Sequence, residues 1–146
     1  MNPDELAEGQ RLPSRQFGPI SRTDIVRYQG ASGDFNPIHH DEPFARDAGY
    51  SSVISVGMLQ AGYVGTYCVD LFGPEGVREI RVRFRDTVVP GDVLRCAGTV
   101  VAAEEAADSA RLLRIEVSLE RMSGGTVLSG DVTVSARLCE PAQLSG

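Results

Sequence analysis

Residues 57–71, with the sequence GMLQAGYVGTYCVDL, decide the fold of this chain. Apolar and small side chains occupy most of these positions, and no charged residue comes before Asp70. A helix that is apolar nearly all round is a buried one, and its glycines let a neighbouring backbone approach closely. We therefore predict a long central helix over about residues 57–71, around which the rest of the chain packs.

The segment that follows this helix changes to a period of two. Ile80, Val82 and Phe84 alternate with arginines, which is typical of a strand buried on one face. Further strands are predicted over about 92–102, 111–122 and 126–138, with a loop at 106–109 and a two-residue hairpin turn at Gly124-Gly125. Antiparallel strands with one wet face, wrapped around a buried helix, indicate an α+β fold.

Two shorter helices are predicted before the central one. Ser21, followed three residues later by Asp24, is a variant of the capping box and predicts a helix over about 22–31. Pro43 and Gly49 bracket a second helix over about 42–48. Side chains of the first helix expected to face the core are Ile25, Val26 and Tyr28.

The length and composition indicate a single globular domain. The chain has 146 residues, of which 42% are hydrophobic and 23% are charged. Its polar ends, residues 1–10 and 140–146, are expected to fray, which leaves a core of about 10–138 within the one domain 1–146.

Charge and cysteine content exclude several functional classes. The net charge of −6 argues against a nucleic-acid partner, which requires a basic footprint. No apolar run is long enough to span a membrane, and the acidic start lacks the order of a signal peptide. Three widely spaced cysteines form neither a disulfide framework nor a zinc motif, so we expect a reducing, cytoplasmic setting.

The run Gly33-Asp34-Phe35-Asn36-Pro37-Ile38-His39 is the candidate for chemistry. Pro37 lacks a backbone N–H and moves the preceding residue out of the helical region, so the run is a turn. Taken singly, Asp34 or Asn36 is a common turn residue, and a lone histidine is more often structural than catalytic. Together, a carboxylate and an imidazole on one turn are the minimal equipment for general acid–base chemistry.

With Ser32 in front, this run resembles the signature of the MaoC-like dehydratases, or (R)-specific enoyl-CoA hydratases: Ser/Thr-Gly-Asp-x-Asn-Pro-hydrophobic-His. Every fixed position of that signature is present. The resemblance extends over roughly residues 10–137, through the segments 21–30, 54–62, 82–84 and 89–92. It implies a hotdog fold, in which the sheet curls around the long helix, and a homodimer joined at sheet edges.

The resemblance also implies roles for individual residues. Asp34 and His39 match the pair that grips the attacking water, and Gly57 matches the residue whose backbone N–H binds the thioester oxygen. Asn36 and Ser32 would brace the loop. The substrate would be an acyl thioester of coenzyme A or acyl carrier protein, with no metal or redox cofactor.

One departure from the family pattern keeps alternatives open. The family usually has His-Gly-Met at the start of the central helix, where this chain has Val56-Gly57-Met58. A non-catalytic subunit that pairs with a related hotdog chain is therefore a second reading. A hotdog thioesterase is a third, although residues 57–69 lack the acidic residue that such enzymes generally carry in the long helix.

The remaining candidates have plainer interpretations. Adjacent His39 and His40 point to opposite faces of an extended chain, so a metal site is not expected. An arginine stripe could meet coenzyme A phosphates or an acidic carrier protein, but a solvated strand face is the favoured interpretation. The stripe comprises Arg78, Arg81, Arg83 and Arg85. Cys68 is expected in the core. Residues assigned to packing or to the lining of an acyl pocket are Tyr50, Val56, Met58, Tyr63 and Phe72.

Overall fold

The computed structural model describes residues 1–105 and 111–135 of the chain. Three α-helices precede the long strands: α1 (Arg22–Ser32), α2 (Glu42–Asp47) and α3 (Gly57–Phe72). The strands are β1 (Arg15–Phe17), β2 (Val77–Phe84), β3 (Leu94–Glu105), β4 (Arg111–Arg121) and β5 (Thr126–Ser135). Two single 3-10 turns, η1 (Pro3–Glu5) and η2 (Pro37–His39), complete the described elements. Each predicted helix is present, with ends within one residue of the prediction.

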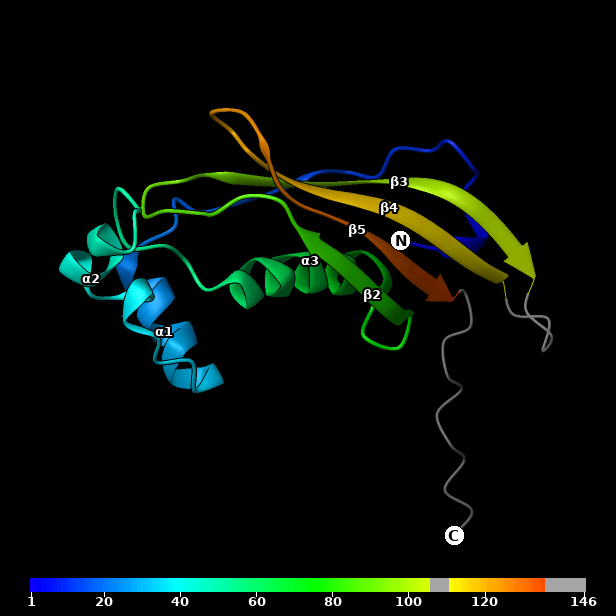
Figure 1. Cartoon of the computed structure of the whole chain (residues 1–146). Helices are drawn as coiled ribbons and strands as arrows, with labels where there is room; N and C mark the ends of the chain where they lie inside the picture. The colour runs from blue at the N-terminus through cyan, green and yellow to red at the C-terminus, as the bar shows by residue number, and fades with distance from the viewer. Residues whose placement is uncertain (106–110, 136–146) are drawn as a thin grey trace, which may run out of the picture.

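The strands form one antiparallel sheet in the order β1-β3-β4-β5-β2. The sheet lies along α3, while α1 and α2 gather beyond the N-terminal end of α3 (Figure 1). This arrangement is the hotdog fold, and it confirms the predicted α+β class. No helix among the described residues is long and apolar enough to cross a membrane.

The core lies between α3 and the inner face of the sheet. Val64, Tyr67 and Cys68 of α3 are buried against alternating residues of the strands, of which Ile115 and Val132 are completely covered. Cys68 is buried, so its prediction as a core residue is confirmed, and this burial raises the pKa of its thiol to about 12.

The burial of the central elements is less complete than the apolar pattern predicts. Met58 and Val69 of α3 are exposed, so this helix is covered on one side only. The expectation of a half-buried β2 is also wrong in part, because Ile80 and Phe84 on its apolar face are exposed. Val26 of α1, expected to face the core, is exposed as well. Apolar surface therefore remains open along α3 and the edge strand β2.

Connections between strands differ from the predictions at two places. The β4–β5 turn spans residues 122–125 rather than two residues, with the Gly124 N–H donating to the Arg121 carbonyl. Strand β5 is described to Ser135, so the predicted continuation to residue 138 lies outside the described residues. The predicted loop at 106–109 and the frayed end at 140–146 also lie outside them.

Gly130 allows β2 to pair closely with β5. It lies opposite Val82 in the ladder, and a Cβ atom built on it would stand 2.2 Å from the Arg81 carbonyl oxygen. No side chain fits at that distance, so the position of β2 depends on the absence of a side chain at residue 130.

The N-terminal segment is packed on the sheet, so the prediction that residues 1–10 fray is wrong. Leu6 is buried in the core. The Arg111 guanidinium donates to the carbonyls of Pro3, Asp4 and Leu6, and the bond to Leu6 measures 2.7 Å. The polar residues of this segment gave no signal of these bonds, because their acceptors are backbone oxygens that any residue carries.

Replacing Arg111 by methionine is expected to detach this segment. The loss of charge-assisted bonds to three carbonyls should lower the free energy of unfolding by about 2 kcal/mol, measured by urea denaturation. Arg114→Met, an exposed position of the same strand, is the matched control and should change stability by less than about 0.5 kcal/mol. Equal effects of the two substitutions would contradict the bracing role of Arg111.

Candidate functional site

The loop between α1 and α2 carries the Asp34–His39 run. Helix α1 begins with a complete capping box at Ser21 and ends at Gly33, whose φ of 73° is left-handed. The Asp34 Oδ1 accepts the Asn36 N–H at 3.2 Å, and the Asn36 Oδ1 accepts the Ile38 N–H at 3.1 Å. Two successive side-chain turns thus shape the run, and the Asn36 side chain braces it.

Asp34 and His39 face each other across this loop. The Asp34 Oδ2 lies 3.7 Å from the His39 Nε2, too far for a direct hydrogen bond but close enough for both atoms to contact one small molecule. The imidazole is only 10% exposed, whereas the carboxylate is 43% exposed. Solvent or a substrate therefore reaches the pair from the side of Asp34.

A backbone carbonyl determines the tautomer of His39. The His39 Nδ1 lies 2.8 Å from the Ile54 carbonyl oxygen, which can only accept. The proton of the neutral imidazole is therefore assigned to Nδ1, and Nε2 presents its lone pair toward Asp34. In this state both facing atoms, Oδ2 and Nε2, are hydrogen-bond acceptors.

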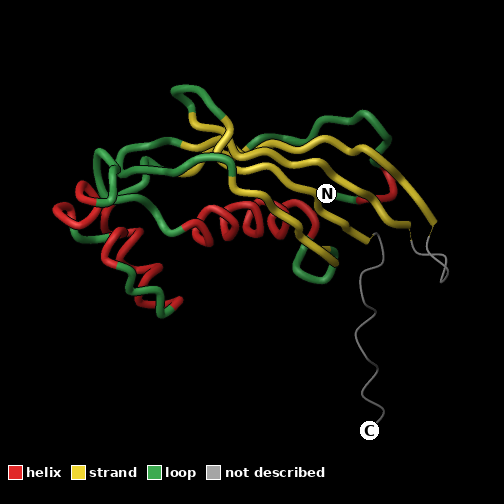
Figure 2. The backbone as a smooth tube through the Cα atoms, viewed as in Figure 1, coloured by secondary structure: helices red, strands yellow, loops and turns green. Residues whose placement is uncertain are grey.

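The same residue, Ile54, joins the loop to the start of α3. Its N–H donates to the Ile38 carbonyl at 3.2 Å, while its carbonyl holds His39. Gly57 follows three residues later as the first residue of α3, and its N–H donates to none of the described residues. Figure 2 shows this connecting loop running from the short helices to α3. A free N–H at the positive end of a 16-residue helix suits an oxygen that gains negative charge.

Phe84 is a residue at this site that sequence reasoning assigned only to a strand. Its ring atom Cε1 lies 3.4 Å from the point where a Cβ atom on Gly57 would stand. The side chain is 48% exposed although it is aromatic. Phe84 therefore covers one side of Gly57, and the contact brings the edge strand β2 to the start of α3.

Gln29 is a second residue that was missed. It is almost completely buried on α1, and its amide nitrogen donates to the carbonyls of Asp34, at 2.8 Å, and Asn36, at 3.3 Å. Its oxygen lies 3.2 Å from the His40 Nδ1. Gln29 thus holds both ends of the loop from behind. The available signal was its place four residues after Ile25, on the same face of the helix, but its partners are backbone atoms that no motif marks.

The other predicted site residues are more scattered. The Ser32 hydroxyl accepts the Asp34 N–H at 3.3 Å and so helps to brace the loop. Val56 lies in the hydrophobic core rather than at an open surface, and Met58 is exposed. Tyr63 stacks on Phe17 of β1 with ring centroids 4.6 Å apart.

Two residues that were assigned to packing or pocket lining differ in exposure. Phe72 is buried in the core, whereas Tyr50 is exposed.

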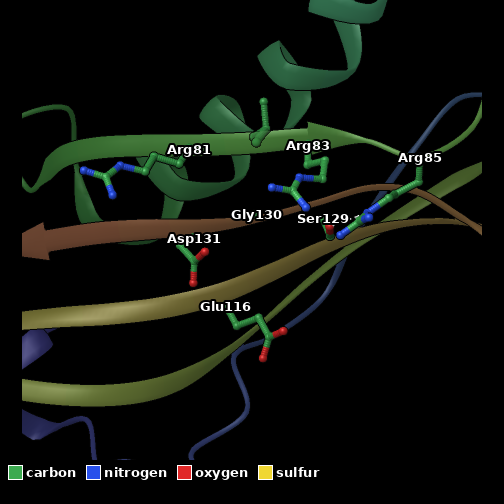
Figure 3. Close-up of a pocket in the computed structure, with 8 residues that line it drawn as sticks. Arg81, Arg83, Arg85, Glu116, Ser129, Gly130 and Asp131 are labelled. Atoms are coloured by element: carbon green, nitrogen blue, oxygen red, sulfur yellow. Dashed lines mark hydrogen bonds between the residues drawn. The ribbon is translucent and has the colours of Figure 1, made fainter.

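Three arginines of the stripe, Arg81, Arg83 and Arg85, lie on the opposite side of the sheet from Phe84. Arg81, Arg83 and Arg85 line a hollow on the outer face of the sheet together with Ser129 and Asp131 (Figure 3). Since alternate residues of a strand point to opposite faces, these guanidinium groups point away from the helix. This placement agrees with the interpretation of the stripe as a solvated strand face.

No group of three or more histidine, cysteine, aspartate or glutamate side chains suited to a metal ion occurs among the described residues.

Comparison with known proteins decides the family. The chain matches the family described as "MaoC like domain" over residues 5–120. It belongs to the MaoC-like domain family. The predicted resemblance is thereby confirmed.

A named relative of this MaoC-like domain points the same way, and a solved structure has the same fold. The (R)-specific enoyl-CoA hydratase of Rhodospirillum rubrum is 30% identical over 99 residues, covering 66% of this chain and 67% of the relative. The crystal structure of the ChsH1-ChsH2 complex from Mycobacterium tuberculosis contains a chain with a TM-score of 0.77 and 24% identity, covering 90% of this chain and 98% of that one.

Larger proteins also contain a matching segment. The peroxisomal hydratase-dehydrogenase-epimerase of Neurospora crassa is 38% identical over 86 residues, covering 56% of this chain. The chain matches only 9% of the length of that relative, so it corresponds to a small part of a multifunctional protein.

Gln29→Met tests how strongly this MaoC-like domain depends on the bonds behind its loop. The substitution keeps the volume but leaves two backbone carbonyls without their donor. The free energy of unfolding should fall by about 1–3 kcal/mol in urea denaturation. Gln16→Met, at an exposed position of β1, is the control and should be nearly neutral. A neutral Gln29→Met would show that the loop does not need this support.

Proposed function

We propose that this protein adds water to trans-2-enoyl thioesters, or removes it from (3R)-hydroxyacyl thioesters, carried by coenzyme A or acyl carrier protein. The observation that carries the proposal is the facing pair Asp34 Oδ2 and His39 Nε2, 3.7 Å apart, on a loop bonded through Ile54 to the start of α3. The (R) configuration is supported by the R. rubrum relative, whose name specifies it.

The pair suits a water nucleophile. A water molecule between two acceptors donates one hydrogen to the Asp34 Oδ2 and one to the His39 Nε2, which leaves an oxygen lone pair for the substrate. The Asn36 N–H occupies the other carboxylate oxygen of Asp34, so Oδ2 is the one left for water. The bond from Nδ1 to Ile54 stabilises the imidazolium that forms when Nε2 takes a proton.

The proton taken from the water is the one delivered to the substrate, so no other proton donor is needed. The water oxygen forms a bond to C3, the C2–C3 π electrons move toward the thioester oxygen, and the His39 Nε2 accepts the water proton. His39 then returns this proton to C2, and the carbonyl re-forms. The N–H of Gly57 donates to the thioester oxygen while that oxygen carries negative charge. One such donor is worth about 10²–10³ in rate.

Turnover of crotonyl-CoA tests the proposal. The conjugated enone absorbance should fall as the substrate is hydrated, and chiral chromatography should identify the product as the (3R)-hydroxyacyl thioester. Asp34→Asn and His39→Ala should each lower kcat by about 10²–10⁴-fold, because the first removes the carboxylate that orients the water and the second removes the base that takes its proton. Asp47→Asn, at an exposed carboxylate of α2, is the matched control and should retain activity.

The absence of turnover with any enoyl chain length, in a folded wild-type protein, would contradict the proposed activity. Release of free thiol from acyl-CoA in the same assay would favour a thioesterase instead. The acidic residue nearest to that role is Asp70, near the end of α3, and it forms an ion pair with Arg15 of β1.

We also propose a homodimer formed at the edge strand β2. This strand pairs with β5 on one side only among the described residues, and Ile80 and Phe84 leave apolar surface beside it. An exposed edge of eight residues is a template for another strand, and pairing with a second copy removes it. Pairing with a related chain is the alternative, supported by the complex of ChsH1 with ChsH2.

Light scattering distinguishes these assemblies. The protein alone should have twice the mass of the 15.7 kDa chain, and Ile80→Lys should shift it toward the monomer. Met122→Lys, at an exposed apolar residue of the β4–β5 turn, should leave the dimer intact. A monomeric and inactive wild-type protein that gains activity with a second hotdog chain would favour the heteromeric alternative.

We further infer a reducing compartment, such as the cytoplasm. Cys68 and Cys96 are both buried with free thiols, which supports this setting.

A further inference from the structure

Buried polar side chains gather at the site. Among the described residues, five polar side chains are buried: Gln29, His39, Ser55, Gln60 and Ser135. Gln29 and His39 belong to the loop described above, while Ser55 and Gln60 lie on either side of Gly57 in sequence. Gln60 is only 4% exposed, and neither the proton transfers nor the loop use it. A buried amide costs free energy unless its polar atoms are hydrogen-bonded, so its partners show what it does.

The Gln60 amide holds the first turn of α3. One of its polar atoms faces the carbonyls of Val56, at 2.7 Å, and Gly57, at 3.0 Å, and the other lies 2.7 Å from the Ser55 hydroxyl. Carbonyl oxygens only accept, so the amide nitrogen is assigned to the carbonyls and the amide oxygen to the hydroxyl. All three polar contacts of Gln60 are then satisfied in a dry environment.

The bond to Val56 reaches the Gly57 amide directly. The Val56 carbonyl and the Gly57 N–H belong to one planar peptide unit and point in opposite directions. The Leu59 N–H donates to this oxygen at 2.9 Å, and the Gln60 amide is its side-chain donor, so the two bonds together fix the direction of the N–H on the other side. Donation to the oxygen also polarises the unit and makes its N–H a stronger donor. Val56 itself makes no side-chain capping bond, so Gln60 provides the side-chain support of this peptide from behind.

We infer that Gln60, held by Ser55, is the positioning residue that orients the Gly57 N–H toward the thioester oxygen. This inference rests on the proposed hydration of enoyl thioesters. Gln60 touches neither water nor substrate in this role, because its bonds are to the opposite side of the Gly57 peptide. Its effect is on the charge-binding donor, whereas Asp34 orients the water and His39 moves its proton.

Gln60→Met provides the main test, because it keeps the buried volume and removes the amide. The value of kcat for crotonyl-CoA should fall roughly tenfold. This fall is smaller than the one of about 10²–10³-fold that removal of a whole donor causes, because the Gly57 N–H itself remains. KM should change little, since the bond is weak to the uncharged carbonyl and strengthens most as the thioester oxygen gains charge. Ser55→Ala should give a smaller fall in kcat. Thr66→Val removes a hydroxyl bond to Gly62 farther along the same helix and should leave kcat unchanged.

Two spectroscopic measurements separate positioning from a general loss of structure. The ¹H–¹⁵N signal of Gly57 should shift in Gln60→Met and stay in place in Thr66→Val. In an Asp34→Asn background, which prevents turnover, infrared spectra of bound crotonyl-CoA labelled with ¹³C at the carbonyl report its polarisation. The shift of the carbonyl stretch to lower frequency on binding should be smaller when Gln60 is methionine. Melting temperatures check that each variant is folded.

Failure of the inference and failure of the proposed function give different results. An active wild-type protein whose kcat, Gly57 signal and carbonyl stretch are all insensitive to Gln60→Met overturns the inference alone. The function is overturned and the inference supported if the wild-type protein binds crotonyl-CoA but never hydrates it, while the carbonyl shift on binding is smaller in Gln60→Met. Crotonyl-CoA that does not bind overturns both. If Gln60→Met does not fold, the same outcomes are read from Ser55→Ala.

Discussion

The peptide groups of Ile54 are the constraint on which the site depends. Its N–H bonds to Ile38 and its carbonyl bonds to the His39 imidazole, so a single residue ties the loop after α1 to the approach of α3. The second bond also selects the imidazole tautomer. Without it, the ring could turn and present a donor instead of a lone pair to the space beside Asp34. The orientation and the tautomer of the ring are therefore set by one backbone carbonyl, which a residue of any type at position 54 would provide.

Two kinds of contact hold the interior of the protein: apolar packing and hydrogen bonds from buried amides. Around α3 the core is apolar, and the strands contribute almost uninterrupted aliphatic surface. At the start of α3 and behind the loop, buried amides bond to backbone oxygens instead. Such bonds are directional and costly to leave unmade, so they favour one arrangement of the backbone over near alternatives. The apolar contacts provide most of the stability, and the two glutamines hold the chain where the chemistry is proposed.

Much of the architecture was predictable because its signals are local. Ser21 with Asp24, Gly33 and the apolar run after Gly57 mark helix ends within a few residues, and the structure agrees with them. The Asp34–His39 turn was predictable for the same reason.

Contacts between distant segments left no such mark. The bonds of Arg111 to the N-terminal segment join residues more than 100 positions apart. The contact of Phe84 with Gly57 and the buried state of Gln60 likewise depend on tertiary packing, which periodicity does not encode.

The close approach of Gly130 to the Arg81 carbonyl makes the site depend on a residue outside it. Gly130 lies on β5, beside the outer hollow, and has no contact with the loop or with α3 among those described. Yet a methyl group there would push against the Arg81 carbonyl and move β2 outward. Phe84 belongs to that strand, so its ring would be drawn away from Gly57. Residue 130 is thus partly exposed to solvent and yet does not accept a side chain. A survey of substitutions would detect it as a position that affects function although it touches no substrate.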